Sequence, residues 1–123
     1  MTTVLVIDDE QMIRWSIEQT LLPGGYDVVA AATAAEGLAL FRSLRPEVVF
    51  LDVRLPDRDG LRVLEEMNGD TGQHAAVIVM SACGDDRTAA EAVRLGARAY
   101  LTKPFDFETL QALVREAMAA QKI

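Results

Sequence analysis

The sequence predicts an α/β fold, a doubly wound five-stranded parallel sheet made of five strand-helix units, (βα)5. Short apolar runs alternate with segments of helical period along the chain. The runs are rich in β-branched residues and show little polar alternation, which is typical of strands covered by helices on both faces. At 123 residues, half of them hydrophobic, the chain has the size of one domain with its own core. We therefore expect residues 1–123 to form one domain.

The apolar runs give the predicted strands, and turn signals and periodicity give the helices between them. The strands are expected at 4–7 (VLVI), 26–31 (YDVVAA), 48–51 (VVFL), 77–80 (VIVM) and 99–101 (AYL). In the first helix Ile13, Ile17 and Leu21 recur at i, i+4 and i+8, and the residues PGG at 23–25 are expected to end it.

The later helices carry their own end signals. Thr33 and Glu36 have capping-box spacing at the start of the second helix, and a helical pattern resumes after Gly60 for the third. Gly96 is expected to end a fourth helix over 86–95, and Asp106 to cap the fifth. The fourth helix is rich in alanine, which predicts Val93 and Leu95 as its bulky apolar contacts.

Composition excludes several classes of function. The net charge of −7, from 19 acidic and 12 basic residues, has the wrong sign for a surface that neutralises DNA or RNA phosphates. The single cysteine, Cys83, cannot form an internal disulfide, and no Cys/His cluster has zinc-site spacing. The N-terminus lacks the pattern of a signal peptide, and no run approaches the ~20 apolar residues of a membrane span. We expect a soluble cytoplasmic protein that contacts neither membrane nor nucleic acid directly.

Polar residues follow four of the five predicted strands. Ligands bind open α/β sheets at the C-terminal ends of the strands, near the point where strand order reverses. The residues found there are Asp8 and Asp9 after the first strand, Asp52 after the third, Ser81 after the fourth, and Thr102 and Lys103 after the fifth. Only ATA follows the second strand. This distribution predicts the strand order 2-1-3-4-5, in which strand 2 is an edge.

The acids at these strand ends predict a cation site. Neighbouring strands lie about 4.8 Å apart, so Asp52 is expected within roughly 5 Å of a carboxylate of the Asp8 and Asp9 pair. Two such charges repel by about 3 kcal/mol at an effective dielectric constant near 20. Oxygen ligands in a partly open site favour Mg²⁺, and the long side chain of Lys103 can cross two strand spacings to reach Asp52.

A carboxylate beside Mg²⁺ and lysine suits the acceptance of a phosphoryl group as an acyl phosphate. In this interpretation Asp52 is the nucleophile, Lys103 stabilises charge on the transferred group, and Ser81 donates a hydrogen bond to a phosphoryl oxygen. The end of a buried strand is a suitable place for such a nucleophile because rigid backbone fixes its position.

Four segments resemble, in order and spacing, the motifs of the receiver domain of two-component response regulators. They are VLVIDDE, VVFLDVRLPDRDG, VIVMSA and GARAYLTKPF, and the resemblance covers essentially the whole chain. It implies a CheY-like, flavodoxin-type topology. It also implies a regulatory phosphorylation switch rather than a conventional enzyme, one that catalyses only its own phosphorylation and dephosphorylation.

The resemblance assigns roles to individual residues. It implies that Asp52 is phosphorylated from the phosphohistidine of a sensor histidine kinase, or slowly from small acyl phosphates. Asp9, Asp52 and the backbone carbonyl of Arg54 would bind Mg²⁺ directly, and Asp8 would act through water. Ser81 and Tyr100 match the switch pair in which the hydroxyl turns toward the phosphoryl group and the ring turns inward.

The resemblance further implies that Lys103 binds phosphate and that the Lys103–Pro104 bond is cis. Signalling would pass through the face formed by the fourth helix, fifth strand and fifth helix, commonly by dimerisation. The stretches IRWSIEQTL and GARAYLTKPFDFETL look like receivers of the NtrC class, which precede an AAA+ ATPase and a DNA-binding module. The chain would then be a fragment of a longer transcription regulator.

Two alternative functions use a similar fold. An aspartate-based phosphohydrolase of the haloacid-dehalogenase type has a second acid two residues beyond its nucleophile, where this chain has Arg54. A flavodoxin-like flavin carrier needs a Gly/Ser/Thr-rich phosphate loop after the first strand, where this chain has the repelling sequence DDE. The sequence also leaves two interpretations of Trp15 open, an exposed contact for a kinase or packing against the last helix.

Overall fold

The computed structural model describes residues 2–69, 75–82 and 86–121. Strands and helices alternate along these residues. The elements are β1 (Thr3–Ile7), α1 (Gln11–Leu21), the short 3-10 helix η1 (Leu22–Gly24), β2 (Asp27–Ala31), α2 (Ala34–Leu44), β3 (Val48–Asp52), α3 (Gly60–Asn68), β4 (Ala76–Ser81), α4 (Asp86–Arg94), β5 (Ala99–Thr102) and α5 (Phe107–Gln121). Each predicted strand and helix is present, with boundaries that differ by one or two residues.

The strands form one parallel sheet in the predicted order, β2-β1-β3-β4-β5. The register pairs Ile7 with Leu51 and Asp52 with Met80. Since β1 and β3 are neighbours, the residues that follow Ile7 and Leu51 leave the sheet side by side. The order therefore brings the acidic strand ends together.

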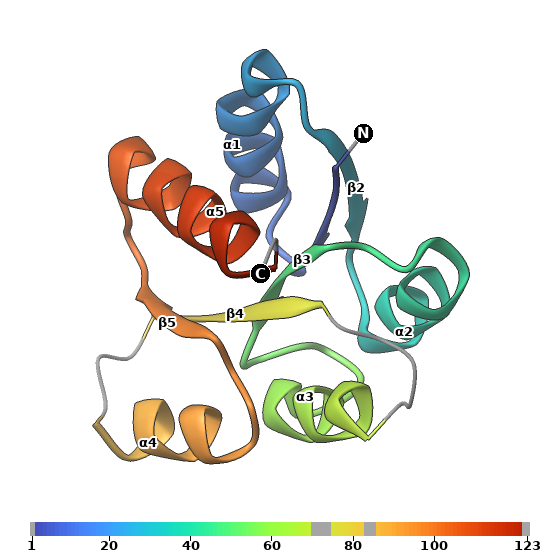
Figure 1. The fold of residues 1–123 in the computed structure, drawn as a ribbon. Helices are drawn as coiled ribbons and strands as arrows, with labels where there is room; N and C mark the ends of the chain where they lie inside the picture. The colour runs from blue at the N-terminus through green and yellow to red at the C-terminus, as the bar shows by residue number, and fades with distance from the viewer. Residues whose placement is uncertain (1, 70–74, 83–85, 122–123) are drawn as a thin grey trace.

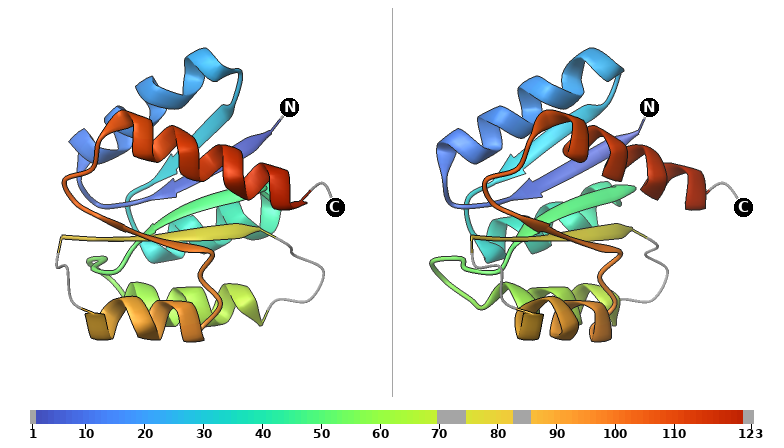
Figure 2. Two further views of the ribbon diagram at one scale, coloured as in Figure 1. Left: turned by 60° about the vertical axis from the view of Figure 1, so that its left-hand side comes forward. Right: turned by 90° about the vertical axis from the view of Figure 1, so that its left-hand side faces the viewer.

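Helices cover both faces of the sheet in two layers (Figures 1 and 2). Helices α1 and α5 lie on one face, and α2, α3 and α4 lie on the other. The side chains of each strand alternate between two cores: Val48 and Phe50 pack under α1 and α5, whereas Val49 and Leu51 pack under α2, α3 and α4. Burial of the central strands on both faces explains their unbroken apolar runs.

The predicted helix ends are largely confirmed. The Glu36 N–H donates to Thr33 Oγ1 at 3.2 Å, although the Glu36 carboxylate accepts from the Ala32 N–H rather than from the Thr33 N–H of an ideal capping box. Asp106 caps α5 by accepting from the Thr109 N–H at 2.7 Å. Gly96 follows α4 with a φ of +106°, a conformation that favours glycine.

The expectation for Val93 was wrong, because its side chain is 61% exposed on α4. Ala92 is the buried residue within α4, and Leu95 is buried just after the helix ends. Leu95 is therefore buried as expected and Ala92 takes the place of Val93, so the hydrophobic contribution that holds α4 against the sheet is smaller than the sequence predicted.

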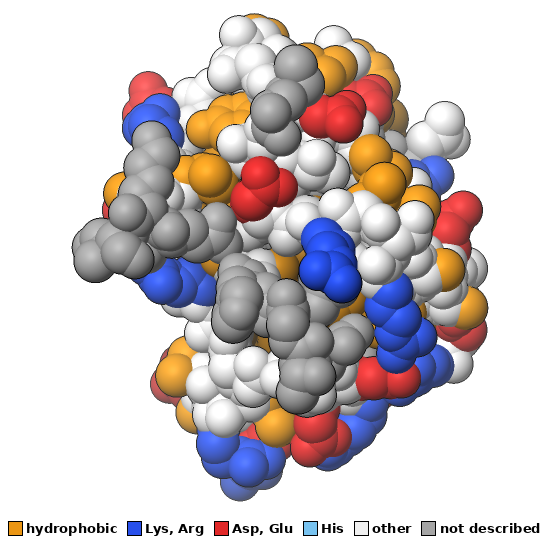
Figure 3. All heavy atoms as spheres, turned by 45° about the vertical axis from the view of Figure 1, so that its right-hand side comes forward, with side chains coloured by type: hydrophobic (Ala, Val, Ile, Leu, Met, Phe, Trp, Pro, Cys, Tyr) orange, Lys and Arg blue, Asp and Glu red, His pale blue; other side chains and the backbone are white. Residues whose placement is uncertain are grey.

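The space-filling view in Figure 3 shows one face, on which acidic and basic side chains stand next to one another in the lower part. Within the described residues, no helix combines the length and hydrophobicity needed to cross a lipid bilayer.

Candidate functional site

The strand ends place Asp8, Asp52 and Lys103 at one edge of the sheet. Asp8 follows β1 directly, and its N–H donates to the Ala31 carbonyl. Asp52 is the last residue of β3, and the next residue continues the ladder by donating from the Val53 N–H to the Met80 carbonyl at 3.0 Å. The Lys103 N–H donates to the Ser81 carbonyl at 2.8 Å. Backbone hydrogen bonds thus fix each of these residues relative to its neighbour.

Three carboxylates meet at this edge, as the sequence predicted. Oxygens of Asp8, Asp9 and Asp52 all lie within 4.8 Å of one another. Asp8 and Asp52 are buried, and Asp9 is exposed at the mouth of the site. Asp8 Oδ2 has no aligned hydrogen-bond donor, although the Lys103 ammonium lies beside it. Three carboxylates whose oxygens lie this close together are hard ligands that fit a divalent cation such as Mg²⁺.

The ammonium of Lys103 lies among these acids. Its Nζ atom is 2.7 Å from Asp8 Oδ2, 3.4 Å from Asp52 Oδ2 and 3.3 Å from Glu10 Oε1. The side chain of Lys103 therefore crosses the two strand spacings between β5 and β3, as was expected from its length. The peptide bond that follows, Lys103–Pro104, is cis, as expected.

The surroundings of Asp52 and Lys103 raise the pKa of both groups. Burial raises the pKa of the Asp52 carboxyl, the charge of Asp8 raises it further, and Lys103 and the Arg54 N–H offset only part of the increase. Burial lowers the pKa of Lys103, but Asp8, Asp52 and Glu10 outweigh that effect and leave it above its usual value. These surroundings thus favour the charged form of Lys103 and disfavour the charged form of Asp52.

A cleft of about 500 Å³ opens over these residues and is lined by Asp9, Glu10, Asp52, Arg54, Ser81 and Ala82. Ser81, the last residue of β4, is buried at the cleft beside Asp52, so the hydroxyl and the carboxylate share one space. Tyr100, in the middle of β5, is half-buried and packs against the core under α2, α3 and α4.

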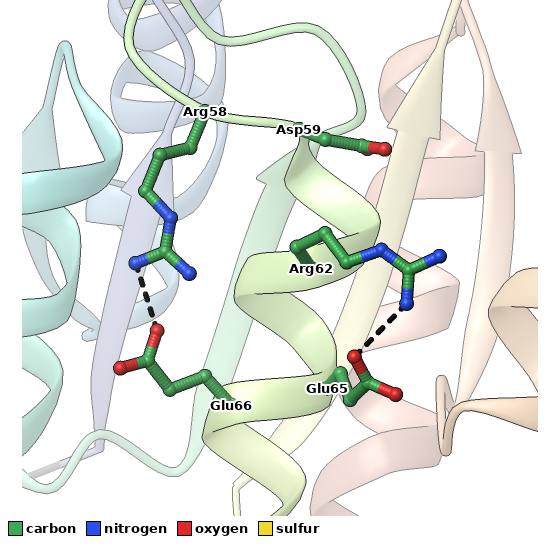
Figure 4. Close-up of a pocket in the computed structure, with 5 residues that line it drawn as sticks. All are labelled: Arg58, Asp59, Arg62, Glu65 and Glu66. Carbon is green, nitrogen blue, oxygen red and sulfur yellow. Dashed lines mark hydrogen bonds and ion pairs between the residues drawn. The ribbon is translucent and has the colours of Figure 1, made fainter.

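A second hollow of about 600 Å³ lies over α3, lined by Arg58, Asp59, Arg62, Glu65 and Glu66 (Figure 4). None of the strand-end residues lines it. Its arginines are paired with glutamates, Arg58 with Glu66 at 2.8 Å and Arg62 with Glu65 at 3.0 Å. We therefore place the functional site at the strand ends.

Sequence reasoning missed three residues that support the site. Glu10 contacts Lys103, and its position directly after the acid pair was a signal that could have found it. Arg14 Nη1, from α1, donates to the Asp8 carbonyl at 2.9 Å. Asp57 accepts hydrogen bonds from the start of α2, more than twenty residues away in sequence, and no local pattern points to that contact.

The Trp15 side chain is 55% exposed on α1, as the first of its two interpretations requires, and its contact with a kinase stays a prediction. Cys83, in the segment after β4, lies outside the described residues.

Comparison with known proteins identifies relatives along nearly the whole chain. Regulatory protein AtoC of Escherichia coli is 34% identical over 120 residues, which cover 98% of this chain and 26% of that protein. Transcriptional regulatory protein KdpE of Mycobacterium tuberculosis is 41% identical over 118 residues, covering 96% of this chain and 51% of KdpE. The chain thus spans about a quarter to a half of the length of the curated relatives it matches.

Solved structures share the fold. A response regulator receiver domain protein from Clostridium thermocellum matches with a TM-score of 0.91 and 33% identity, covering 99% of this chain and 98% of that one. NtrX from Brucella abortus matches with a TM-score of 0.91 and 32% identity, covering 99% of this chain and 28% of NtrX.

The family model of the response regulator receiver domain matches residues 4–115, a span that contains all the strand-end residues of the site. With that match, and with relatives above 30% identity along almost its whole length, the chain belongs to the response regulator receiver domain family, whose members are regulatory domains of two-component systems.

Proposed function

We propose that this receiver domain accepts a phosphoryl group at Asp52 from the phosphohistidine of a sensor histidine kinase. The observation that carries the proposal is the buried Asp52 carboxylate, which lies within 4.8 Å of two other carboxylates and 3.4 Å from the Lys103 ammonium. Its position at the end of β3, facing a cleft, leaves one side open to a donor.

Asp9, Asp52 and the backbone carbonyl of Arg54 would hold Mg²⁺ directly, and Asp8 would act through water. When bound, Mg²⁺ supplies positive charge that offsets the carboxylates and the oxygens of the transferred phosphoryl group. The donor set fits it because every proposed ligand is an oxygen and the site lies in an open cleft.

In the transfer step an Asp52 oxygen forms a bond to phosphorus while the phosphorus–nitrogen bond of phosphohistidine breaks and the imidazole ring leaves. Lys103 is already charged and beside Asp52, so it can stabilise the phosphoryl oxygens without being reorganised. Ser81, at the same cleft, would donate its hydroxyl hydrogen to one of these oxygens. Hydrolysis of the acyl phosphate by water at the same site would reset the domain.

Phosphorylation would act through α4, β5 and α5. Ser81 ends β4, so its movement toward a phosphoryl group pulls on the connection to α4. Few buried side chains hold α4, so a coupling free energy of about 1 to 3 kcal/mol is enough to reposition it. Tyr100 would turn inward as Ser81 moves, and the changed surface would control dimerisation or an output domain.

The output domain would lie outside this chain. The relatives of this chain include AtoC, a regulatory protein, and KdpE, a transcriptional regulatory protein, which supports control of transcription. Such a regulator would act in the cytoplasm. An NtrC-class output, with an ATPase and a DNA-binding module, stays a prediction that the neighbouring residues of the parent gene would test. The exposed Trp15 on α1 provides an apolar contact for the kinase.

Intact-mass measurement after incubation with a small acyl phosphate and Mg²⁺ tests the acceptor. We expect one added phosphoryl group on the wild type and on Asp27→Asn, a matched change of an exposed acid on β2, and none on Asp52→Asn. Equal phosphorylation of Asp52→Asn and wild type would contradict the assignment. Steady turnover of a phosphate ester would instead support a phosphohydrolase.

Hydrogen exchange with and without beryllofluoride, which mimics the phosphoryl group, tests the switch. We expect protection to change across α4 and β5. Changes confined to residues 8, 9 and 52–60 would show that the signal does not leave the site by this route.

A further inference from the structure

The loop that joins β3 to α3, residues 53–59, is held at both ends and at its tip. At its base the Gly60 N–H donates to the Val53 carbonyl at 2.7 Å, and Arg54 forms a β-bridge with Asp59. Asp59 also caps α3, since its carboxylate accepts from the Leu61 N–H. These contacts close the loop but leave the position of its tip undetermined.

The tip is held by a helix from another part of the chain. Asp57 Oδ1 accepts from the Ala34 N–H at 2.8 Å, and Asp57 Oδ2 accepts from the Ala35 N–H at 3.0 Å. Both donors belong to the first turn of α2, whose N–H groups lack partners within the helix. Both carboxylate oxygens are used, so the contact fixes the orientation of the loop as well as its distance from α2.

Helix α2 does not need Asp57 for its own cap. Thr33 already occupies the N-cap position and accepts from the Glu36 N–H. The Asp57 contact therefore joins two elements that local capping would leave independent. A second link runs beside it, because Glu66 of α3 pairs with Arg58 of the loop and with Arg42 of α2.

We infer that Asp57 is a positioning residue for the metal site. It lies three residues after Arg54, whose backbone carbonyl is one of the proposed Mg²⁺ ligands, and five after Asp52. The bridge between Arg54 and Asp59 closes the loop at its base, so the base and the tip are connected rigidly. Anchoring the tip to α2 therefore restricts the angle at which the Arg54 carbonyl faces the cleft. This inference rests on the proposed function, because it concerns a ligand of that same site.

Calorimetric titration with Mg²⁺ tests the inference on four proteins: wild type, Asp57→Ala, Asp57→Asn and Thr33→Ala. Removing groups that orient a metal ligand typically weakens metal affinity 10- to 100-fold, and we expect the Mg²⁺ dissociation constant of Asp57→Ala to rise about tenfold. Asp57→Asn keeps the oxygen that faces Ala34 and should fall between Asp57→Ala and wild type.

Thr33→Ala is the matched control because it removes a cap from the same helix without touching the loop. Both alanine variants should melt at lower temperature than wild type, but only Asp57→Ala should lose Mg²⁺ affinity, measured well below the melting temperature of every variant. Hydrogen exchange of residues 53–59 should rise in Asp57→Ala and stay unchanged in Thr33→Ala.

The outcomes distinguish failure of the positioning role of Asp57 from failure of the proposed function. Equal Mg²⁺ affinity of Asp57→Ala and wild type, or equal losses in Asp57→Ala and Thr33→Ala, would overturn the positioning role and leave the proposed function intact. If the wild type binds no Mg²⁺, the proposed function fails and this inference fails with it. Should Asp57→Ala not fold, Asp57→Asn decides by the same comparison.

Discussion

Replacing Asp52 by asparagine should stabilise the metal-free protein, because it removes one of three crowded negative charges without changing side-chain shape. Taking the 4.8 Å separation at an effective dielectric constant of 20, Asp52 is repelled by about 3.5 kcal/mol by each of the other two carboxylates. The Lys103 ammonium at 3.4 Å attracts it by about 5 kcal/mol on the same scale. Asp9 is exposed, so solvent reduces its share.

With the share of Asp9 reduced, these repulsions and the attraction to Lys103 nearly cancel, and the net penalty for the charge comes mainly from burial, the largest cause of the raised pKa of Asp52. Asparagine keeps an oxygen for the Arg54 N–H, and Lys103 remains paired with Asp8 and Glu10. We expect a gain of about 1 to 3 kcal/mol in the free energy of unfolding, or roughly 4 to 12 °C in melting temperature for a domain of this size.

Thermal melts with a chelator present test this expectation across pH. The folded pKa of Asp52 is raised, so its charge costs stability only as pH rises from the unfolded value near 3.9 through the folded value. The advantage of Asp52→Asn should be absent below about pH 4 and should grow as pH rises through the folded pKa of Asp52. Mg²⁺ should raise the melting temperature of the wild type more than that of the variant.

Asp27→Asn, on the exposed end of β2, is the control for loss of an acid elsewhere and should change the melting temperature little. A melting temperature of metal-free Asp52→Asn below that of the wild type at neutral pH would show that Lys103 fully compensates the acids. The crowding argument would then be wrong.

Three further predictions concern the loop and the core. In Gly60→Ala the new Cβ would lie 2.0 Å from the Asp52 carbonyl oxygen, so we expect a loss of about 1 to 3 kcal/mol in chemical denaturation and slower phosphorylation. Gly69→Ala, with its nearest atom at 3.6 Å, is the control, and equal losses in both would contradict the steric reason. The N–H groups of α2 lower the pKa of Asp57, so its stabilising effect is present at neutral pH and is lost as pH falls below about 4 toward the folded pKa. Asp57→Asn should flatten the acid side of the stability profile, and an unchanged profile would refute this. Leu110→Ala, in the fully buried core under α5, should cost about 2 to 5 kcal/mol in urea unfolding, and a loss below about 1 kcal/mol would show that the core refills the cavity.

The fold could be predicted from the sequence because its signals are local and repeated. The central strands β1, β3 and β4 are buried on both faces, so their apolar runs are unbroken, and each helix has a cap or a stop within a few residues. The strand order followed from one further fact, that polar residues are missing after β2. Side-chain exposure on α4 was less predictable: Ala92 faces the core, so Val93, which lies about 100° further around the helix, points outward.

The site likewise contains residues that the sequence predicts and residues that only the structure shows. Asp8, Asp52, Ser81 and Lys103 could be predicted because a parallel sheet fixes where its strands end, and one strand spacing then gives the distance between neighbours. Contacts that depend on how a loop folds over a helix carry no such rule. Asp57 stands in the sequence as one more acid in a polar turn, and only the packing of the loop against α2 shows that its charge is used by two N–H groups. The sheet thus fixes the positions of the residues that would perform the proposed chemistry, whereas tertiary packing fixes the position of Asp57, the residue proposed to orient their loop. Stability should distinguish mutations of the two kinds: Asp52→Asn should stabilise the metal-free protein, and Asp57→Ala should destabilise it while weakening Mg²⁺ binding.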